Sequence, residues 1–213
     1  EDTKNNYDVA IIGAGPAGIS ATLAAKHQGL RYVTIEQEDT FGGTTLHYPR
    51  GKVVMTAPMN LPIIGKIKVT ETTKEELMNI WDDVVTKAGI RINFSERMEK
   101  IERRGDAFNV VTSRASYLTR SVLLSIGRRG TPRKLEVSGE ELEKVVYRLI
   151  DPEQYRGKHV LVVGGGDAAL EAAVAISENS DSTVTLSYRG NAFNRVKTKN
   201  RQSLEKASDA GRI

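Results

Sequence analysis

One pattern of glycines occurs twice in this chain of 213 residues, and no other feature constrains the fold as strongly. Each copy is a short apolar run, a glycine-rich turn and an alanine-rich stretch; the first begins with Tyr7–Gly18 and the second with His159–Ala169. In both copies 23 positions separate the first glycine of the turn from the residue that ends the following apolar run. Two strand–turn–helix–strand units at equal spacing predict an α/β protein with two Rossmann-like nucleotide-binding domains.

The first copy carries the spacing Gly13-x-Gly15-x-x-Gly18, the fingerprint of a dinucleotide-binding turn. Gly13 permits a tight turn, Gly15 lets the backbone approach a pyrophosphate, and Gly18 allows the helix to pack closely on the strand. The pyrophosphate then lies against unpaired N–H groups at the start of the helix. Glu36 ends the next strand, where its carboxylate can accept hydrogen bonds from ribose hydroxyls. A glycine-rich turn that only packs is the alternative.

The second copy, Gly164–Ala169, repeats this spacing with alanine at the third position. Ser187 stands where the first copy has Glu36, so no acid is present to repel a ribose 2′-phosphate. Residues 189–213 hold seven basic and two acidic side chains, a charge of +5, whereas the whole chain carries +4. The net charge of the other residues is therefore about −1, so the basic charge is confined to residues 189–213. Arg189 and its basic neighbours favour NADP(H) over NAD(H), with a solvated basic surface as the alternative.

Between the two copies the sequence predicts mixed structure. Thr73-Lys-Glu-Glu76 is a capping box that predicts the start of a helix with Trp81 on its apolar face and its end at Gly89. Four strand regions are expected after it: Ile90–Phe94, a hairpin over Met98–Val111, Ala115–Leu118 and Ser121–Ile126. Two segments are expected to lack regular structure: Thr40–Ile67 as an ordered loop and Arg128–Gly157 as a domain crossover.

Composition removes several classes of chemistry. The chain has no cysteine, which excludes disulfides, thiolate metal sites and dithiol exchange within it. Its three histidines are scattered, so no metal site is expected. No apolar run reaches the ~18–20 residues that a membrane span requires, and no leader opens the sequence. We expect a cytoplasmic protein with no membrane partner, and the initial Glu1 suggests an excised segment.

Together these residues resemble the thioredoxin-reductase-like flavoproteins, in the superfamily of FAD- and NAD(P)H-dependent pyridine nucleotide-disulfide oxidoreductases. The resemblance implies FAD at the first motif and NADPH at the second, with the NADPH domain inserted into the FAD domain. Phe41-Gly-Gly-Thr44 is similar to the family's Gly-Gly-Gln turn beside the flavin, and Ser125-Ile-Gly127 resembles its Ala-Thr-Gly segment that closes over FAD. Gly164–Glu171 looks like the NADPH turn, and Tyr188-Arg189 falls on the His-Arg pair that reads the 2′-phosphate.

The chain departs from that family in two ways. The redox-active Cys-Ala-Thr-Cys-Asp of thioredoxin reductases falls on Tyr147–Asp151, which retains only the aspartate. Without thiols the chain cannot reduce a partner by exchange, so it resembles the branch without these cysteines, near ferredoxin- or flavodoxin-type reductases and low-molecular-weight disulfide reductases. The family's C-terminal FAD segment is also absent, so we expect a fragment with an FAD-binding domain at 1–128 and a partial NAD(P)-binding domain at 129–213.

The motifs and the resemblance assign cofactor-binding residues to both sites. For FAD these are Gly13, Ala14, Gly15, Pro16, Ala17, Glu36, Gln37, Gly43, Thr44 and Gly127. For NADP(H), with NAD(H) as the alternative, they are Gly164, Gly166, Asp167, Ala168, Arg189 and Arg195. No catalytic side chain and no metal ligand is assigned, because the cofactors carry the hydride chemistry. Among the other polar residues, we expect His47 to be a hydrogen-bonded loop residue and Asp151 a helix cap or a surface residue, with proton donation as the alternative for both. We expect Asp167 to be a cap or a brace for the turn.

These features predict an FAD-dependent oxidoreductase that takes hydride from NADPH to the flavin and passes electrons to an unidentified acceptor without a dithiol. The acceptor would be a small molecule or a small redox protein, and the protein a homodimer. A regulatory or redox-sensing module that binds FAD or NADP(H) without turnover is the alternative. Nucleic-acid binding is not expected, because only Tyr188 and Phe193 lie among the basic residues as stacking platforms.

Overall fold

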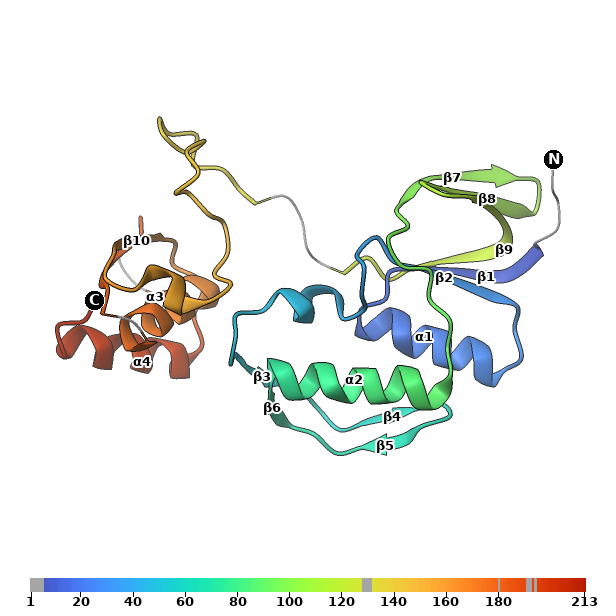
Figure 1. Ribbon diagram of the computed structural model, residues 1–213, viewed down its shortest axis with the longest axis horizontal. Helices are drawn as coiled ribbons and strands as arrows, with labels where there is room; N and C mark the ends of the chain where they lie inside the picture. Colours follow the sequence, from blue (N-terminus) through green and yellow to red (C-terminus); the bar gives the residue numbers. More distant parts are fainter. Residues whose placement is uncertain (1–5, 128–131, 180, 191–192, 194) are drawn as a thin grey trace. The chain divides into compact units, whose positions relative to one another are not determined.

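The computed structural model describes residues 6–127, 132–179, 181–190, 193 and 195–213. The chain divides into two compact units, Glu1–Lys134 and Leu135–Ile213 (Figure 1). Both units combine helices with parallel strands, which confirms the predicted α/β class. The predicted domain boundary between residues 128 and 129 lies outside the described residues, and the division into an FAD-binding and an inserted NAD(P)-binding domain stays a prediction.

The first unit is built on a five-stranded sheet with the order β2-β1-β9-β8-β7. Its strands are β1 (Asn6–Ile12), β2 (Tyr32–Ile35), β7 (Met98–Arg104), β8 (Ala107–Thr112) and β9 (Ser116–Leu124). β1 is parallel to both β2 and β9, whereas β7, β8 and β9 form an antiparallel meander (Figure 1). Helix α1 (Pro16–His27) connects β1 to β2. The carboxyl ends of β1 and β9 therefore lie together beside the start of α1, which is where ligands bind in such sheets.

Two details of this sheet differ from the expected strands. Ala115–Leu118 and Ser121–Ile126 were expected as separate strands, but β9 is continuous because its first half pairs with β8 and its second half with β1. Ile90–Phe94 was expected as a strand, but it makes only one bridge, between Ile35 and Asn93. Left-handed residues at Gly89 (φ 56°) and Ser95 (φ 51°) turn the chain on both sides and leave too few residues for a ladder.

A second layer of the first unit covers α1. It contains a 3₁₀ turn η1 (Gly43–His47), four short strands and helix α2 (Lys74–Ala88). The strands pair antiparallel, β3 (Val53–Met55) with β6 (Glu71–Thr73) and β4 (Met59–Leu61) with β5 (Gly65–Ile67). The prediction of a loop over Thr40–Ile67 was therefore wrong for η1, β3, β4 and β5. Strands of three residues are too short to show a period-two pattern.

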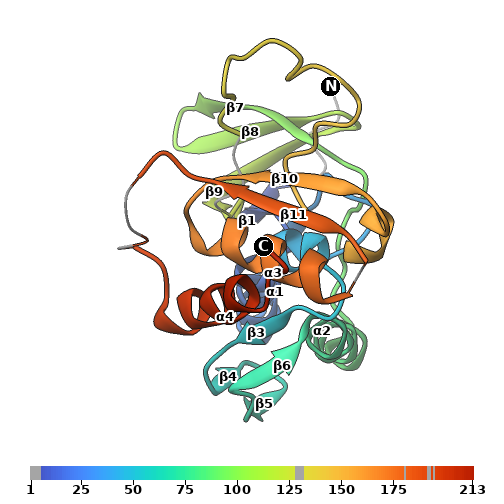
Figure 2. The same ribbon diagram turned by 90° about the vertical axis from the view of Figure 1, so that its left-hand side faces the viewer.

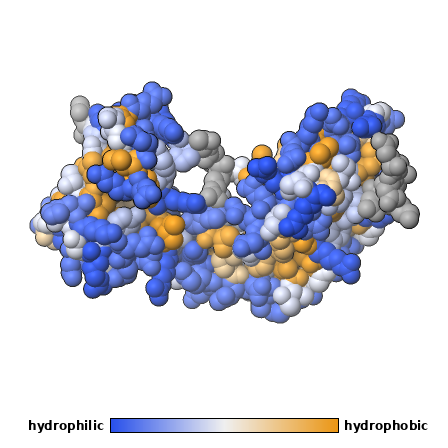
Figure 3. All heavy atoms as spheres, turned by 45° about the horizontal axis from the view of Figure 1, so that its top comes forward, coloured by the Kyte–Doolittle hydropathy of each residue, from blue (hydrophilic) through white to orange (hydrophobic). Residues whose placement is uncertain are grey.

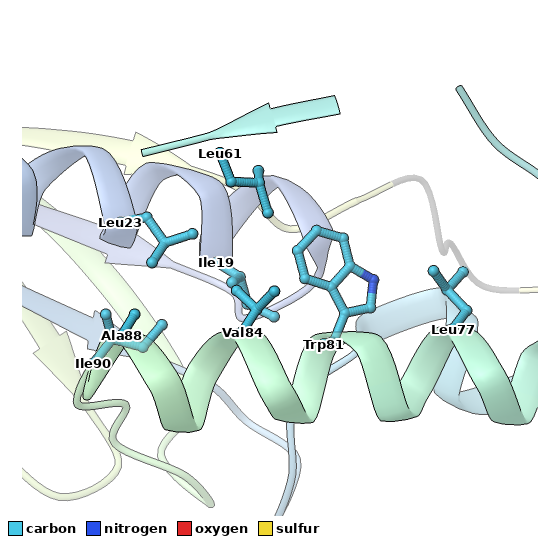
Figure 4. Packing of buried hydrophobic residues seen from close by; sticks show 8 residues of the cluster. All are labelled: Ile19, Leu23, Leu61, Leu77, Trp81, Val84, Ala88 and Ile90. Atoms are coloured by element: carbon cyan, nitrogen blue, oxygen red, sulfur yellow. The ribbon is translucent and has the colours of Figure 1, made fainter. Parts of the chain in front are cut away.

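The core of the first unit lies between α1 and α2. Figure 4 shows apolar side chains of the two helices meeting there, with Leu61 from β4. Trp81 is 2% exposed, which confirms its predicted place in the core. A second cluster packs β1 and β2 against the meander through Ala10, Val33, Val110 and Tyr117, among others. The glycine turn after β1 is thus fixed by packing on several sides.

The second unit has a smaller sheet of two parallel strands, β10 (His159–Val163) and β11 (Thr183–Ser187), which lie side by side in Figure 2. Its helices are α3 (Asp167–Asn179) and α4 (Thr198–Asp209), and a 3₁₀ turn η2 (Pro152–Tyr155) precedes β10. The Asp151 carboxylate accepts a hydrogen bond from the N–H of Glu153 and caps η2, as predicted. One face of the sheet packs on α3, whereas the side chains of Leu161 and Val163 on the other face are exposed. The face in Figure 3 is mostly hydrophilic with several hydrophobic patches, and further large apolar side chains, such as Met55 and Ile126, are exposed.

The capping box of α2 yields a stability prediction. The Thr73 hydroxyl accepts a hydrogen bond from the N–H of Glu76 at 3.2 Å, and the Glu76 carboxylate accepts one from the N–H of Thr73 at 3.0 Å. Replacing Thr73 with Ala leaves an N–H of the first turn without its partner. We expect Thr73→Ala to lower the free energy of unfolding by about 1 kcal/mol, measured by urea denaturation. The control Thr86→Ala, at an exposed position near the end of the same helix, should leave stability unchanged or slightly higher.

Candidate nucleotide-binding sites

The glycine turn after β1 accepts no larger residues at its first and third glycines. Gly13 has a φ of 104°, and a Cβ there would lie 2.5 Å from the carbonyl oxygen of Ser125 at the end of β9. A Cβ on Gly18 would overlap the carbonyl oxygen of Gly13. The turn is also bonded to both neighbouring strands, since the N–H of Gly13 donates to Ile35 and the N–H of Ser125 donates to Ile12. These contacts are the close helix–strand packing that the fingerprint predicts.

Glu36 lies directly beneath this turn and is 6% exposed. Its Oε2 accepts a hydrogen bond from the N–H of Ala14 at 2.6 Å, and its Oε1 accepts one from the N–H of Glu38 at 3.0 Å. A carboxylate offers about four acceptor positions, so these two bonds leave capacity for ribose hydroxyls. The same side chain therefore shapes the turn and fits the sugar of a dinucleotide. The carbonyl oxygen of Ala14 is also engaged, since it accepts a hydrogen bond from Gly42.

The other predicted FAD-binding residues converge on the same turn. A Cβ on Gly43 would lie 3.1 Å from the Cα of Gly15, so η1 reaches the turn through two facing glycines. Gly127 lies beside Thr44, since a Cβ there would be 3.8 Å from the Thr44 hydroxyl oxygen. Segments from three separate parts of the sequence thus meet around the start of α1.

An apolar pocket of about 370 Å³ opens beside the first turn of α1. Its lining comes from α1, η1, β3, β4 and α2: Pro16, Ala17, Ser20, Thr45, Val54, Met55, Thr56, Met59, Leu61, Leu77 and Trp81. Figure 4 shows the Trp81 ring between α2 and Leu61, with its nitrogen turned toward the side of Leu77. In the described part of the chain the buried Nε1 of Trp81 has no hydrogen-bond partner. A buried donor of this kind costs stability unless a ligand or water satisfies it. The lining of the pocket suits a mostly apolar group.

A second, open pocket of about 460 Å³ lies just past Glu36. It is lined by Gln37, Glu38, Ser95, Arg97 and Ser113. Gln37, a predicted FAD-binding residue, therefore borders a hollow that continues from the ribose acid. His47 approaches this region, because its Nε2 is 3.5 Å from Oε1 of Glu38, a contact that is an ion pair only when the imidazole is protonated; its role as a hydrogen-bonded loop residue stays a prediction.

A buried polar cluster lies next to the residues that line the second pocket. Oε1 of Glu96, a residue 3% exposed, accepts hydrogen bonds from the hydroxyls of Tyr117 at 2.8 Å and Thr112 at 2.5 Å. The Tyr117 hydroxyl oxygen accepts a further bond from the side-chain amide of Asn93. Burial, followed by the hydrogen bond and the charge of Glu96, raises the pKa of Tyr117 to about 12. The cluster ties the segment that carries Ser95 and Arg97 to the sheet.

The turn after β10 has a different construction. Gly164 has a φ of 147°, and its N–H donates a hydrogen bond to the carbonyl of Ser187 at the end of β11. A Cβ on Gly164 would lie only 3.1 Å from the Cβ of Ala169. The alanine at the third position therefore fits because residue 164 has no side chain. A Cβ on Gly165 would overlap the ring of Tyr188, so this ring lies directly against the turn. Gly166 has open space around it and stays free for a ligand.

The expected basic residues flank this second turn. Arg189 and Arg195 are both exposed, and between them Phe193 stacks on Tyr188 with ring centroids 5.3 Å apart. Oδ1 of Asp167 accepts hydrogen bonds from the N–H of Lys197 at 2.9 Å and from the side-chain amide of Asn200 at 2.8 Å. Asp167 therefore connects the turn to the start of α4, which agrees with its expected role as a brace.

Three residues of these sites were not singled out from the sequence. Gly165 lies between Gly164 and Gly166, the two glycines that the fingerprint requires in the second copy. A third glycine that the fingerprint does not require was the signal that could have identified it. Trp81 was assigned to the core, and sequence carries no signal that its N–H lacks a partner. Asn200 lies in a polar, basic stretch without any motif.

Among the described residues no group of three or more His, Asp or Glu side chains is arranged to hold a metal ion, and no helix there is long and apolar enough for a membrane span.

Comparison with known proteins identifies relatives for almost the whole chain. The sequence profile of the family described as pyridine nucleotide-disulphide oxidoreductase matches residues 10–211. The ferredoxin–NADP reductase of Streptococcus pneumoniae is 29% identical over 181 residues, which are 84% of this chain and 53% of the relative. The chain thus spans about half the length of the curated relatives it matches.

Solved structures show the same fold. The bacillithiol disulfide reductase of Bacillus cereus superposes with a TM-score of 0.87 at 24% identity, over 98% of this chain and 66% of that one. The thioredoxin reductase of Lactococcus lactis superposes with a TM-score of 0.68 at 25% identity, over 92% of this chain and 60% of that one. These superpositions confirm the predicted thioredoxin-reductase-like fold.

The raised pKa of Tyr117 predicts a dependence of stability on pH. Because its pKa rises from 10.0 to about 12 on folding, the neutral phenol is favoured in the folded state. Its contribution is complete below pH 10 and is lost as the pH rises from 10 to about 12. Urea denaturation across this window should show a steeper loss of stability in the native chain than in Tyr117→Phe. Tyr32→Phe is the matched control and should lose stability like the native chain; equal slopes in all three proteins would contradict the assignment.

Proposed function

We propose that this chain, which belongs to the pyridine nucleotide-disulphide oxidoreductase family, binds FAD in its first unit and NADP(H) in its second, as part of an NADPH-dependent flavoprotein oxidoreductase. The observation that carries the proposal is the difference between the two glycine turns. Glu36 lies buried beneath the first, whereas the second has Ser187 at the equivalent position and exposed arginines beside it. One turn therefore suits a free ribose, and the other suits a ribose that carries a phosphate.

In this proposal, different residues of the first unit bind different parts of FAD. The backbone of Gly15 and Ala17 at the start of α1 would receive the pyrophosphate, and Glu36 the ribose hydroxyls. The open pocket bordered by Gln37 would hold the adenine end. The apolar pocket beside Ala17 and Thr45 would hold the flavin end. Gly43, Thr44 and Gly127 would close around the middle of the cofactor.

The second unit would hold the nicotinamide nucleotide. The open backbone at Gly166 and the first turn of α3 at Ala168 would receive the pyrophosphate of NADP(H). Arg189 and Arg195 would bind the 2′-phosphate through charge-assisted hydrogen bonds. NAD(H) is the alternative at this turn.

The kind of electron acceptor is inferred from the absence of cysteine in the chain and from the names of its relatives. When bound together, the two cofactors supply hydride transfer from nicotinamide to flavin and onward electron delivery. The chain has no cysteine, so its own residues provide no dithiol relay to an acceptor. Relatives named ferredoxin–NADP reductase favour a small redox protein as the acceptor, with a small molecule as the alternative. A homodimer and a cytoplasmic location belong to the same proposal.

The absence of thiols also favours a second candidate. A module that binds FAD or NADP(H) without turnover, for regulation or redox sensing, needs the same two turns and no acceptor site. The two candidates differ in whether the bound flavin accepts electrons.

The first test is spectroscopic. We expect the purified chain to bind FAD and to lose the visible flavin absorbance band when NADPH is added without oxygen. A yellow protein that keeps its band under NADPH would support the regulatory module. A protein that does not bind added FAD would contradict the assignment of the first turn. The variant Glu36→Ala should weaken FAD binding, because it removes the ribose acceptor and releases the N–H of Ala14.

The second test concerns the 2′-phosphate. We expect Arg189→Glu to weaken NADPH binding at least about tenfold, because it removes a charge-assisted bond and adds repulsion. Binding of NADH should change little. Lys158→Glu makes the same change of charge at an exposed residue before β10, at the end of the strand opposite to the turn, and should leave both affinities unchanged. Equal losses for NADPH and NADH would contradict the role of Arg189.

A further inference from the structure

We propose that Asp167 and Asn200 are positioning residues that set the preference for NADP(H), because they anchor the basic arm to the second glycine turn. The basic arm is defined as Arg189, Arg195, Lys197 and Lys199. The inference rests on the proposed function, because it explains how this chain would hold a 2′-phosphate.

The first anchor lies where the chain leaves β11. The carbonyl of Ser187 accepts a hydrogen bond from the N–H of Gly164 at 2.9 Å. The ring of the next residue, Tyr188, packs directly on Gly165 and against Gly190. Arg189 therefore follows two consecutive residues that contact the turn, and its backbone is held beside the proposed pyrophosphate site.

The second anchor lies where the chain enters α4. Oδ1 of Asp167 accepts hydrogen bonds from the N–H of Lys197 at 2.9 Å and from Nδ2 of Asn200 at 2.8 Å. Nδ2 of Asn200 also donates to Oε1 of Glu171, one turn further along α3, at 2.9 Å. The amide of Asn200 thus bridges two carboxylates. It does so as a neutral double donor, which no acidic side chain could replace without bringing a third negative charge to the cluster.

Both anchors end on the same turn, because Gly164 and Asp167 are three residues apart. Arg189 directly follows Tyr188 of the first anchor, and Arg195 lies two residues before Lys197 of the second. The backbones of Arg189 and Arg195 are therefore each within two residues of a contact to the turn, and both side chains are exposed.

Anchoring of this kind affects one class of ligand more than another. Ordering long basic side chains around a phosphate costs conformational entropy, and a backbone fixed in advance lowers that cost. Only a nucleotide with a 2′-phosphate uses the basic arm. A nucleotide without it relies on the backbone N–H groups of the glycine turn and of the start of α3, and the side chains of Asp167 and Asn200 do not supply those donors.

The helix that carries Asn200 does not depend on it for packing. Leu204 and Ala207 on the same helix are buried, at 7% and 0% exposure. Asn200→Ala removes two hydrogen bonds but places a better helix former in α4. We therefore expect the variant to fold and to keep α4 near α3, with its first turn no longer fixed to Asp167.

The test is calorimetric titration with two probes, 2′,5′-ADP and 5′-ADP, which differ by the phosphate in question and require no bound flavin. We expect Asn200→Ala to weaken 2′,5′-ADP about tenfold and 5′-ADP less than about twofold. Asp167→Ala should weaken 2′,5′-ADP by at least as much. Asp167→Asn should recover most of the affinity, because its amide oxygen still accepts from the N–H of Lys197. Gln202→Ala, at an exposed position of the same helix, is the control and should match the native chain.

Two results would overturn the inference. If the native chain prefers 2′,5′-ADP and Asn200→Ala keeps that preference, the anchors do not set it, while the proposed function stands. If both probes lose affinity equally in Asn200→Ala, the residue maintains the turn as a whole. A native chain that binds the two probes equally would instead contradict the proposed NADP(H) site itself, and this outcome is visible before any variant is made.

Discussion

The contact between the carbonyl of Gly13 and the first turn of α1 is the constraint on which the first unit depends. Because Gly18 has no Cβ, the helix backbone comes as close to the strand as van der Waals contact allows. That proximity brings the start of α1 to the carboxyl edge of β1 and β9, and it places Glu36 beneath the N–H of Ala14. The pockets on both sides of the turn follow from this arrangement, since one is lined by α1 and the other by residues that follow Glu36.

The two copies of the motif show how one local design supports two electrostatic environments. In the first, the acid at the end of the second strand bonds to the turn and is buried. In the second, serine ends the strand, and only its backbone carbonyl contacts the turn. The carboxylate at the second turn belongs to Asp167, and it accepts a hydrogen bond from the N–H of Lys197, the N-cap residue of α4. The negative charge thus contacts a basic segment, whereas in the first copy it contacts the N–H of Ala14.

The sequence was sufficient for the features that depend on local patterns. The repeated glycine spacing predicted both turns, the capping box predicted the start of α2, and the resemblance brought Gly43, Thr44 and Gly127 to the first turn, where the structure also has them. Pairs of short strands such as β4 and β5 were not predictable, because three residues carry no period. The Trp81 N–H that lacks a partner and the two hydrogen bonds donated by the Asn200 amide depend on tertiary neighbours. Neither can be predicted from the residue type. Ile90–Phe94 has the alternation of a strand, but the left-handed turns beside it end the pairing.

The ring of Tyr188 against Gly165 links two positions that lie 23 residues apart in sequence. Any side chain at 165 would require a smaller residue at 188, and a smaller residue at 188 would leave the backbone of the turn uncovered. Position 165 can therefore accept a side chain only together with a smaller residue at 188. A variant library that randomises position 165 alone should recover mostly glycine, whereas randomising both positions together opens combinations that this single library cannot reach.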